Sequence, residues 1–192
     1  LDELDFHIDD QANVSVHELV AKMHQQMAAT EGRLSLVVVD YLQLIQKPDT
    51  GNKNRNEASL VGEITRTLKL AARDLNIPIV LLSQLNREIE KRTSSRPVLS
   101  DLKDSGSIEQ DADIVAFIHR SIVTKKGTIA GEQAALQADL ILAKHRNGPV
   151  GEIPLEFKPE WTQYLEVTRE TGLPTASVPK ADSQGVQGNL YE

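Results

Sequence analysis

The stretch LSLVVVD, residues 34–40, is almost wholly apolar, rich in β-branched side chains, and ends in Asp40. Such a run is typical of a central strand in a parallel sheet, which is covered on both faces. A second run of this kind covers residues 77–82 and is followed by Ser83 and Gln84. Because ligand sites in open α/β sheets lie beyond the carboxyl ends of the strands, we expect Asp40 and Gln84 to lie side by side at such a site.

Two amphipathic helices are expected around these strands. Ser15 and Glu18 form a capping-box pattern at the start of the first helix. Apolar residues at helical spacing between residues 60 and 75 indicate the second helix. The order strand, helix, strand indicates a right-handed parallel crossover. Residues 6–9 are interpreted as the end of a further short strand.

The second half of the sequence is expected to end the sheet in an antiparallel meander. In chain order we expect a loop at 87–106, a short helix at 107–110, a third buried strand at 114–118 and a turn or insertion at 123–133. Three more strands are expected at 138–143, 152–157 and 163–167. The sequence therefore predicts one α/β domain over residues 1–167. Residues 168–192 contain few large apolar side chains, which predicts a disordered tail.

Composition restricts the function. The chain has 192 residues, no cysteine and a formal net charge of −7, which excludes disulfides and thiolate metal sites. It has no apolar run that could span a bilayer and no signal-peptide pattern at its start, so we expect a cytoplasmic protein without a membrane partner. The negative charge argues against binding nucleic acid with the whole surface. Cations outnumber anions between Arg87 and Lys103, which favours local contact there; an ordinary solvated face is the alternative.

An apolar strand that ends in aspartate is what a Walker B motif requires. The carboxylate then lies at the edge of the sheet, where it can hold Mg²⁺, usually through water, beside bound phosphates. Asp40 fits this role, and a helix cap or loop anchor is the alternative.

Four segments of the chain strengthen this interpretation when they are taken together. They are LVVVDYLQLIQ (36–46), IVLLSQLNREIEKR (79–92), RPVLSDLKDSGSIEQDADIVAFIHR (96–120) and LILAKHRNGPVGEIPLEF (140–157). In this order they resemble the C-terminal ATPase domain of DnaB-type replicative helicases. The resemblance implies a RecA-like three-layer fold, a mostly parallel sheet with helices on both faces, and a hexameric ring that binds ATP and Mg²⁺ between neighbours.

The resemblance also implies what the ring does. ATP hydrolysis would drive translocation on single-stranded DNA in the central channel and unwind the duplex at the replication fork. Partners would be the neighbouring subunits, primase and a helicase loader. The location would be the bacterial nucleoid and replisome, or an organelle of bacterial origin.

Individual residues acquire roles from the same resemblance. Asp40 would be the Walker B aspartate, and Gln84 the sensor of the γ-phosphate, with a strand-end hydrogen bond as the alternative. An amide suits a sensor because it can donate to a phosphate oxygen and accept from a water. Lys144 and Arg146 resemble the basic pair that the family projects into the neighbouring subunit's nucleotide site. Arg146 would be the arginine finger, with a solvated basic turn as the alternative.

Lys103, Asp104, Ser105 and Gly106 match the family loop that lines the channel and holds DNA phosphates. Gly106 lets the main chain approach a phosphate closely, and backbone amides bind it without reading sequence. Family members often have Arg-Glu-Ser-Gly here. Lysine lacks the planar fork of arginine, so we expect a weaker phosphate contact at position 103 without loss of function.

The sequence contains no Gly-Lys dipeptide and therefore no P-loop. The resemblance implies that the P-loop and a catalytic glutamate precede residue 1, so that the N-terminal part of the domain is missing and this chain alone is inactive. Two alternatives stay open. One is a naturally short, non-hydrolysing subunit that joins or modulates a helicase ring. The other is a RecA-like ATPase of the recombinase or clock-protein kind, which would lack SGSIEQDAD and AKHRNGPVG.

Overall fold

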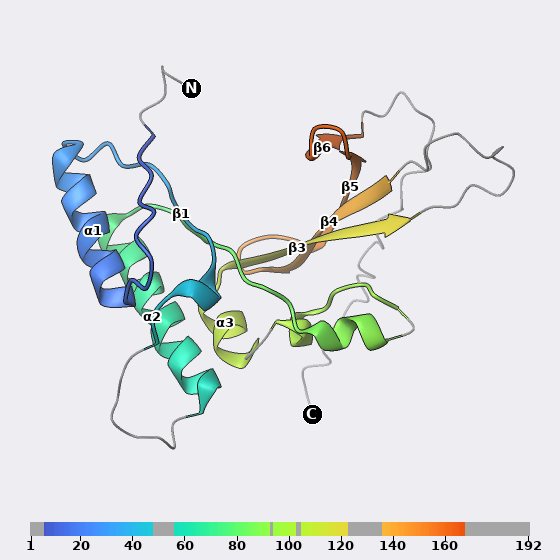
Figure 1. Cartoon of the computed structure of the whole chain (residues 1–192), viewed down its shortest axis with the longest axis horizontal. Coiled ribbons are helices and arrows are strands. Elements are labelled where there is room, and N and C mark those ends of the chain that lie inside the picture. Colours follow the sequence, from blue (N-terminus) through green and yellow to red (C-terminus); the bar gives the residue numbers. More distant parts are fainter. Residues whose placement is uncertain (1–5, 48–55, 93, 103–104, 123–135, 168–192) are drawn as a thin grey trace, which may run out of the picture.

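The computed structural model describes residues 6–47, 56–92, 94–102, 105–122 and 136–167 of the chain (Figure 1). Its helices and strands are α1 (Val16–Ala29), β1 (Val37–Val39), α2 (Glu57–Leu75), β2 (Ile79–Leu81), α3 (Ser105–Asp111), β3 (Ile114–Ile122), β4 (Leu136–His145), β5 (Gly151–Lys158) and β6 (Gln163–Glu166). Short 3₁₀ helices lie between them, namely η1 (Leu42–Leu44), η2 (Arg87–Lys91) and η3 (Leu99–Asp101). The predicted insertion at 123–133 and the predicted tail at 168–192 lie outside the described residues.

The two long helices begin at the side chains that cap them. Ser15 accepts a hydrogen bond from the Glu18 amide at 3.2 Å, as the capping pattern predicts. Asn56 accepts from the Ala58 amide at 3.2 Å and starts α2. At the other end of α2, Asn76 adopts the left-handed conformation with φ 54°, which ends the helix ahead of Pro78. Both predicted helices are confirmed.

Strands β1 and β2 pair in parallel, with Val39 opposite Leu81. Helices α1 and α2 lie side by side near this pair (Figure 1). Val39 is buried in one cluster with side chains of both helices. The members of that cluster that come from the helices are Val16, Met23, Val61, Ile64 and Leu68. The core therefore lies between the two helices and one face of the parallel strands, and it continues through Ile108 of α3 to Val115, Phe117 and Ile141 of the antiparallel strands.

The other face of the parallel strands is exposed, contrary to the prediction of cover on both sides. Val38 is 56% exposed and Val80 is 48% exposed, whereas Val39 is only 8% exposed. Successive side chains of a strand point to opposite faces, and in the described part of the chain only one face is covered. Each strand also spans three residues and is shorter than the apolar run that predicts it.

The C-terminal strands form the predicted antiparallel meander, in the order β3–β4–β5–β6. Residues 114–118 open β3, which pairs with β4. The prediction of a fully buried strand is wrong there, because Val115 and Phe117 are buried while Ile114 and Ile118 are each more than half exposed. Among the described residues, the parallel part of the architecture is thus the β1–β2 pair, and the meander is a separate sheet.

Residues 6–9 do not form the predicted strand. Phe6 is 74% exposed and Ile8 is 73% exposed, and the segment joins no ladder with the described strands. Its visible attachment is polar, since Asp9 forms an ion pair with Lys22 of α1 at 2.5 Å. Two apolar residues in alternation do not make a strand when no described strand pairs with them.

Helix α3 packs closely against α2 and begins two residues earlier than predicted. A Cβ atom on Gly62 of α2 would lie 2.6 Å from the Ser107 hydroxyl oxygen. One turn further along α2, Thr65 donates a hydrogen bond to the Asp111 carboxylate at 2.6 Å. The missing side chain at Gly62 therefore lets the two helices approach each other.

We expect Val39→Ala to lower the free energy of unfolding by about 1.5–3 kcal/mol, the contribution of a buried valine side chain. Val38→Ala, the matched change on the exposed face, should cost much less. Urea denaturation of both variants measures the difference. Equal losses at the two positions would contradict the one-sided cover of the sheet.

Gly62→Ala should destabilise the chain, because overpacking costs about 1–3 kcal/mol and outweighs the gain of up to about 1 kcal/mol in helix propensity. Gly106→Ala is the matched control in α3, since a Cβ there meets nothing within 4 Å. It should be neutral or stabilising. The expected order of urea midpoints is Gly106→Ala at or above the parent chain and Gly62→Ala below it; the reverse order would rule out the tight α2–α3 contact.

Candidate functional site

The structure brings Asp40 and Gln84 to the same edge of the parallel strands. The Leu82 amide donates to the Val39 carbonyl at 3.0 Å, and the Leu42 amide donates to the Leu82 carbonyl at 2.9 Å. These bonds carry the pairing past the ends of β1 and β2. Asp40 and Gln84 follow directly and are both exposed. The peptide bond from Asp40 to Tyr41 is cis.

Gln43 joins the two strand ends, a role that the sequence did not suggest. Its amide nitrogen donates to the Ser83 hydroxyl at 3.2 Å, and its amide oxygen accepts from the Gln84 backbone N–H at 3.2 Å. A glutamine side chain can make both bonds at once because it carries a donor and an acceptor. The available signal was its position three residues after Asp40, but only the fold shows that this places it against Gln84.

The donor set at this edge suits a partly hydrated magnesium ion. Among the described residues, no group of three or more His, Asp or Glu side chains is arranged to hold a metal ion. Mg²⁺ is commonly bound through one or two carboxylates, with waters and substrate phosphates as the other ligands. An exposed carboxylate at a strand end, as at Asp40, is compatible with that mode.

Lys144 and Arg146 meet at the C-terminus of α3. The Lys144 ammonium donates to the Glu109 carbonyl, and the Arg146 guanidinium donates to the Gln110 carbonyl at 3.0 Å. Both carbonyls belong to the last turn of α3, where cations interact favourably with unpaired carbonyls and with the helix dipole. The two side chains thus reach the same place although β4 ends at His145, and the Arg146 side chain stays 51% exposed.

Asp113 and Lys69 lie beside Lys144 and Arg146, and the four residues form one charged cluster. The sequence did not single out Asp113 or Lys69. Asp113 forms an ion pair with Lys69 of α2, and its other carboxylate oxygen lies 3.5 Å from Arg146. The hydrogen bond from Lys69 and the nearby positive charges of Arg146 and Lys144 lower the pKa of Asp113. Asp113 is the last residue of the SGSIEQDAD motif, but its partner Lys69 is 44 residues away in sequence.

The segment predicted to contact DNA lies partly outside the described residues, which include neither Lys103 nor Asp104. Ser105 and Gly106 form the first turn of α3, and Gly106 is exposed with open space around its Cα. Helix α3 therefore connects the predicted DNA segment, at its start, with Lys144 and Arg146, at its end.

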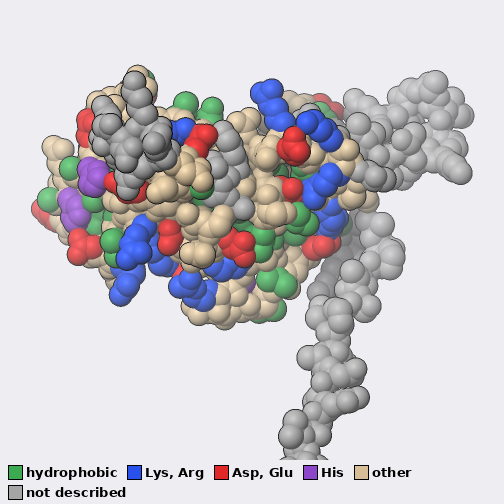
Figure 2. All heavy atoms as spheres, turned by 90° about the horizontal axis from the view of Figure 1, so that it is seen from below, with side chains coloured by type: hydrophobic (Ala, Val, Ile, Leu, Met, Phe, Trp, Pro, Cys, Tyr) green, Lys and Arg blue, Asp and Glu red, His purple; other side chains and the backbone are tan. Residues whose placement is uncertain are grey.

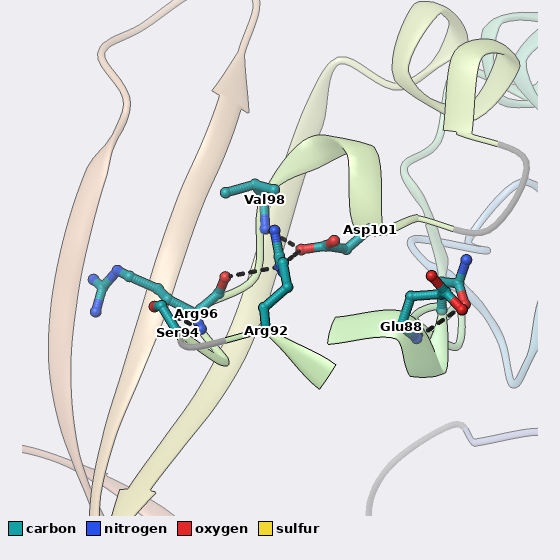
Figure 3. A network of polar contacts seen from close by, with 7 residues as sticks. Glu88, Arg92, Ser94, Arg96, Val98 and Asp101 are labelled. Carbon is teal, nitrogen blue, oxygen red and sulfur yellow. Dashed lines mark hydrogen bonds and ion pairs between the residues drawn. The ribbon is translucent and has the colours of Figure 1, made fainter. Parts of the chain in front are cut away.

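Three cations of the stretch between Arg87 and Lys103 are engaged by carboxylates. Figure 3 shows Arg92 directed at Asp101. The guanidinium and the carboxylate are 2.5 Å apart, and the same carboxylate accepts a hydrogen bond from the Val98 amide at 2.8 Å. Arg96 contacts Asp139 of β4 at 3.5 Å and Glu152 of β5, and Lys91 pairs with Glu88 at 2.8 Å. This favours a structural role for Arg92 and Arg96.

Basic and acidic side chains are interspersed on the face shown in Figure 2, rather than gathered into one basic patch. This distribution agrees with the net charge of −7. Any contact with nucleic acid on this face would be local. No helix in the described ranges is long and apolar enough to cross a membrane.

Comparison with known proteins gives one consistent result. The family model of the DnaB-like helicase C-terminal domain matches residues 1–166. A probable replicative DNA helicase of Trieres chinensis is 42% identical over 166 residues, which are 86% of this chain and 36% of that protein. The replicative DNA helicase DnaB of Rickettsia felis is 39% identical over 184 residues, 89% of this chain and 36% of that protein. The chain thus spans about a third of the length of these relatives.

Solved structures agree with the sequence relatives. An ATPase domain superposes with a TM-score of 0.74 at 35% identity, over 87% of this chain and 56% of its own length. A DnaB-like replicative helicase, solved in a study of its interactions with primase, gives a TM-score of 0.72 at 36% identity, over 84% of this chain and 38% of its own. These neighbours confirm the predicted RecA-like α/β fold. The chain belongs to the family of the DnaB-like helicase C-terminal domain.

Proposed function

We propose that this chain is part of the motor domain of a hexameric replicative DNA helicase, which couples ATP hydrolysis to translocation on single-stranded DNA and to duplex unwinding at the replication fork. The observation that carries the proposal is the parallel pairing of β1 and β2, which ends both strands at one edge with Asp40 and Gln84 exposed. In a chain of this family, that edge is where the phosphates of a nucleotide belong.

Each polar residue at this edge has a defined task in the proposal. Asp40 would hold Mg²⁺ through water, and the bound ion would supply positive charge beside the phosphates. Gln84 senses the γ-phosphate with its amide, while Gln43 holds the backbone of Gln84 in place. The side chain of Gln84 can then respond to the nucleotide without movement of the strand end.

Lys144 and Arg146 serve the nucleotide of the neighbouring subunit. Arg146 follows the end of β4 and its side chain is half exposed beside the less exposed Lys144, so it can leave its contacts with α3 and extend to a neighbouring subunit. The planar guanidinium of Arg146 matches the oxygens of a phosphoryl group in transfer, where such a finger raises the rate by about 10³–10⁵. A complete site therefore needs two copies of the domain.

Lys103, Asp104, Ser105 and Gly106 contact the phosphates of single-stranded DNA in the channel. Gly106 is exposed in the first turn of α3, where backbone amides have no acceptor within the helix. Contacts of this kind are independent of base sequence, as a helicase requires.

Neighbouring subunits, primase and a helicase loader are the proposed protein partners. A solved relative of this domain was studied with primase, which supports primase as a partner of the whole assembly. The proposed location is the replisome, in the bacterial cytoplasm or in an organelle of bacterial origin.

The chain alone should not hydrolyse ATP, because its sequence has no P-loop. When it is mixed with a P-loop-bearing fragment of the same family, ATPase activity should appear, measured as phosphate release. Arg146→Ala and Arg146→Lys should remove about 10³-fold or more of that activity, since neither side chain replaces the planar fork.

Arg73→Lys is the matched control, an exposed arginine in the last turn of α2, and should leave the mixture active. Turnover by the chain alone would refute its predicted dependence on a P-loop partner. If the two parts bind each other but the mixture shows no ATPase activity, the alternative of a non-hydrolysing subunit is favoured.

In the mixed assembly, Lys103→Ala should weaken binding to single-stranded DNA by a similar factor for every base sequence. Loss of one phosphate contact should reduce the slope of log affinity against log salt by about 0.7. Titration of fluorescent oligonucleotides at several salt concentrations measures this slope. Lys22→Ala on α1, whose lysine pairs with Asp9, should leave it unchanged. A slope unaffected by Lys103→Ala would remove that residue from the DNA contact.

A further inference from the structure

Arg146 is held by its own domain in this structure. Its guanidinium donates to the Gln110 carbonyl at 3.0 Å and lies 3.5 Å from an Asp113 carboxylate oxygen. Its backbone amide donates to the Asp113 carbonyl at 2.8 Å. The backbone bond can persist when the side chain moves, but the guanidinium must leave both of its acceptors to reach a phosphate on another subunit.

The Asp113 carboxylate is shared between two cations. One oxygen pairs with Lys69, whose side chain is 27% exposed, and the other faces Arg146, which is 51% exposed. Lys69 donates a hydrogen bond to the carboxylate and is the less exposed of the two cations, whereas Arg146 lies 3.5 Å from the other oxygen. Water and salt screen the contact to Arg146 more, so it is the weaker of the two.

We propose that Asp113 is a positioning residue for Arg146: it docks the guanidinium against the end of α3, and Lys69 weakens the dock by competing for the same carboxylate. This rests on the proposed role of Arg146 as a finger. The contact with Asp113 keeps the Arg146 side chain in one position and orientation when no phosphate is within reach. When a phosphate is within reach, the side chain leaves Asp113 and binds it.

The strength of the dock suits such an exchange. An exposed ion pair changes an equilibrium by about two- to fivefold. Arg146 lies 3.5 Å from one oxygen of Asp113, whereas a phosphate can accept two short, parallel hydrogen bonds from the same guanidinium. A phosphate therefore outcompetes Asp113. Without Lys69 the carboxylate would be free to form the bidentate pair with Arg146, and release would be harder.

The test uses two variants of the full 192-residue chain with opposite expected effects. NMR line shapes of the Nη nuclei report how fast the Arg146 guanidinium rotates about its Nε–Cζ bond. Asp113→Asn should speed this rotation about two- to fivefold, and Lys69→Gln should slow it by a similar factor. The rotation rate depends on the bonds to the guanidinium itself. A general loss of stability would therefore not change the rotation rate in opposite directions in the two variants.

Asp74→Asn is the matched control, because Asp74 is an exposed carboxylate of α2 that pairs with His24 at 3.4 Å. It should leave Arg146 rotation unchanged. Unchanged rotation in Asp113→Asn, or faster rotation in Lys69→Gln, would overturn the dock. Lys69→Gln keeps the test decisive even where Asp113→Asn folds poorly.

A second measurement separates the dock from the finger. In the ATPase mixture, the concentration of this chain that gives half-maximal activity should fall about two- to fivefold for Asp113→Asn and rise for Lys69→Gln, with the maximal rate nearly unchanged. A change confined to the maximal rate would contradict competition between dock and phosphate. If rotation responds as expected while Arg146→Ala leaves the mixture fully active, the dock stands and the proposed finger fails.

Discussion

The contact between α2 and α3 is the constraint on which the rest of the structure depends. Gly62, Thr65 and Lys69 lie three and four residues apart along α2, so they form one stripe of the helix. This stripe meets Ser107, Asp111 and Asp113 in turn. The residues Val61, Ile64 and Leu68, each one position earlier along α2, enter the core with β1. Helix α2 thus fixes the position of α3, and with it the charged cluster around Arg146, relative to the parallel strands.

Local chemistry made much of this fold predictable. Helix α1 starts at Ser15, as the capping pattern predicted, because that side chain satisfies a free amide. Apolar spacing predicted α2, whereas its ends at Asn56 and Asn76 were identified in the structure. The carboxyl ends of the apolar runs located Asp40 and Gln84. What the sequence could not reveal is which neighbour covers a surface. Val38 and Val39 are the same residue type, and only the position of the helices makes one exposed and the other buried.

The candidate site shows the same division. The resemblance to the helicase family indicated Lys144 and Arg146, but their acceptors are backbone carbonyls of α3, which have no signature in sequence. Asp113 and Lys69 are far apart along the chain, so their pairing depends on the packing of α2. The partners of Arg96, Asp139 and Glu152, come from distant strands, so the sequence could not reveal them. Asp101 lies in the same stretch as Arg92, but only the structure shows that the two side chains pair.

Helix α2 also bears on how the chain reaches this fold. Residues 40–78 separate the two parallel strands, and α2 occupies 19 of them. Parallel strands are slow to pair because the entropy of closing a long connection is lost before any contact forms. A helix with a side-chain cap at its start and a left-handed residue at its end can form through contacts between residues that are close in sequence. Its formation shortens the part of the connection that must be closed at random, so β1 and β2 can meet early during folding.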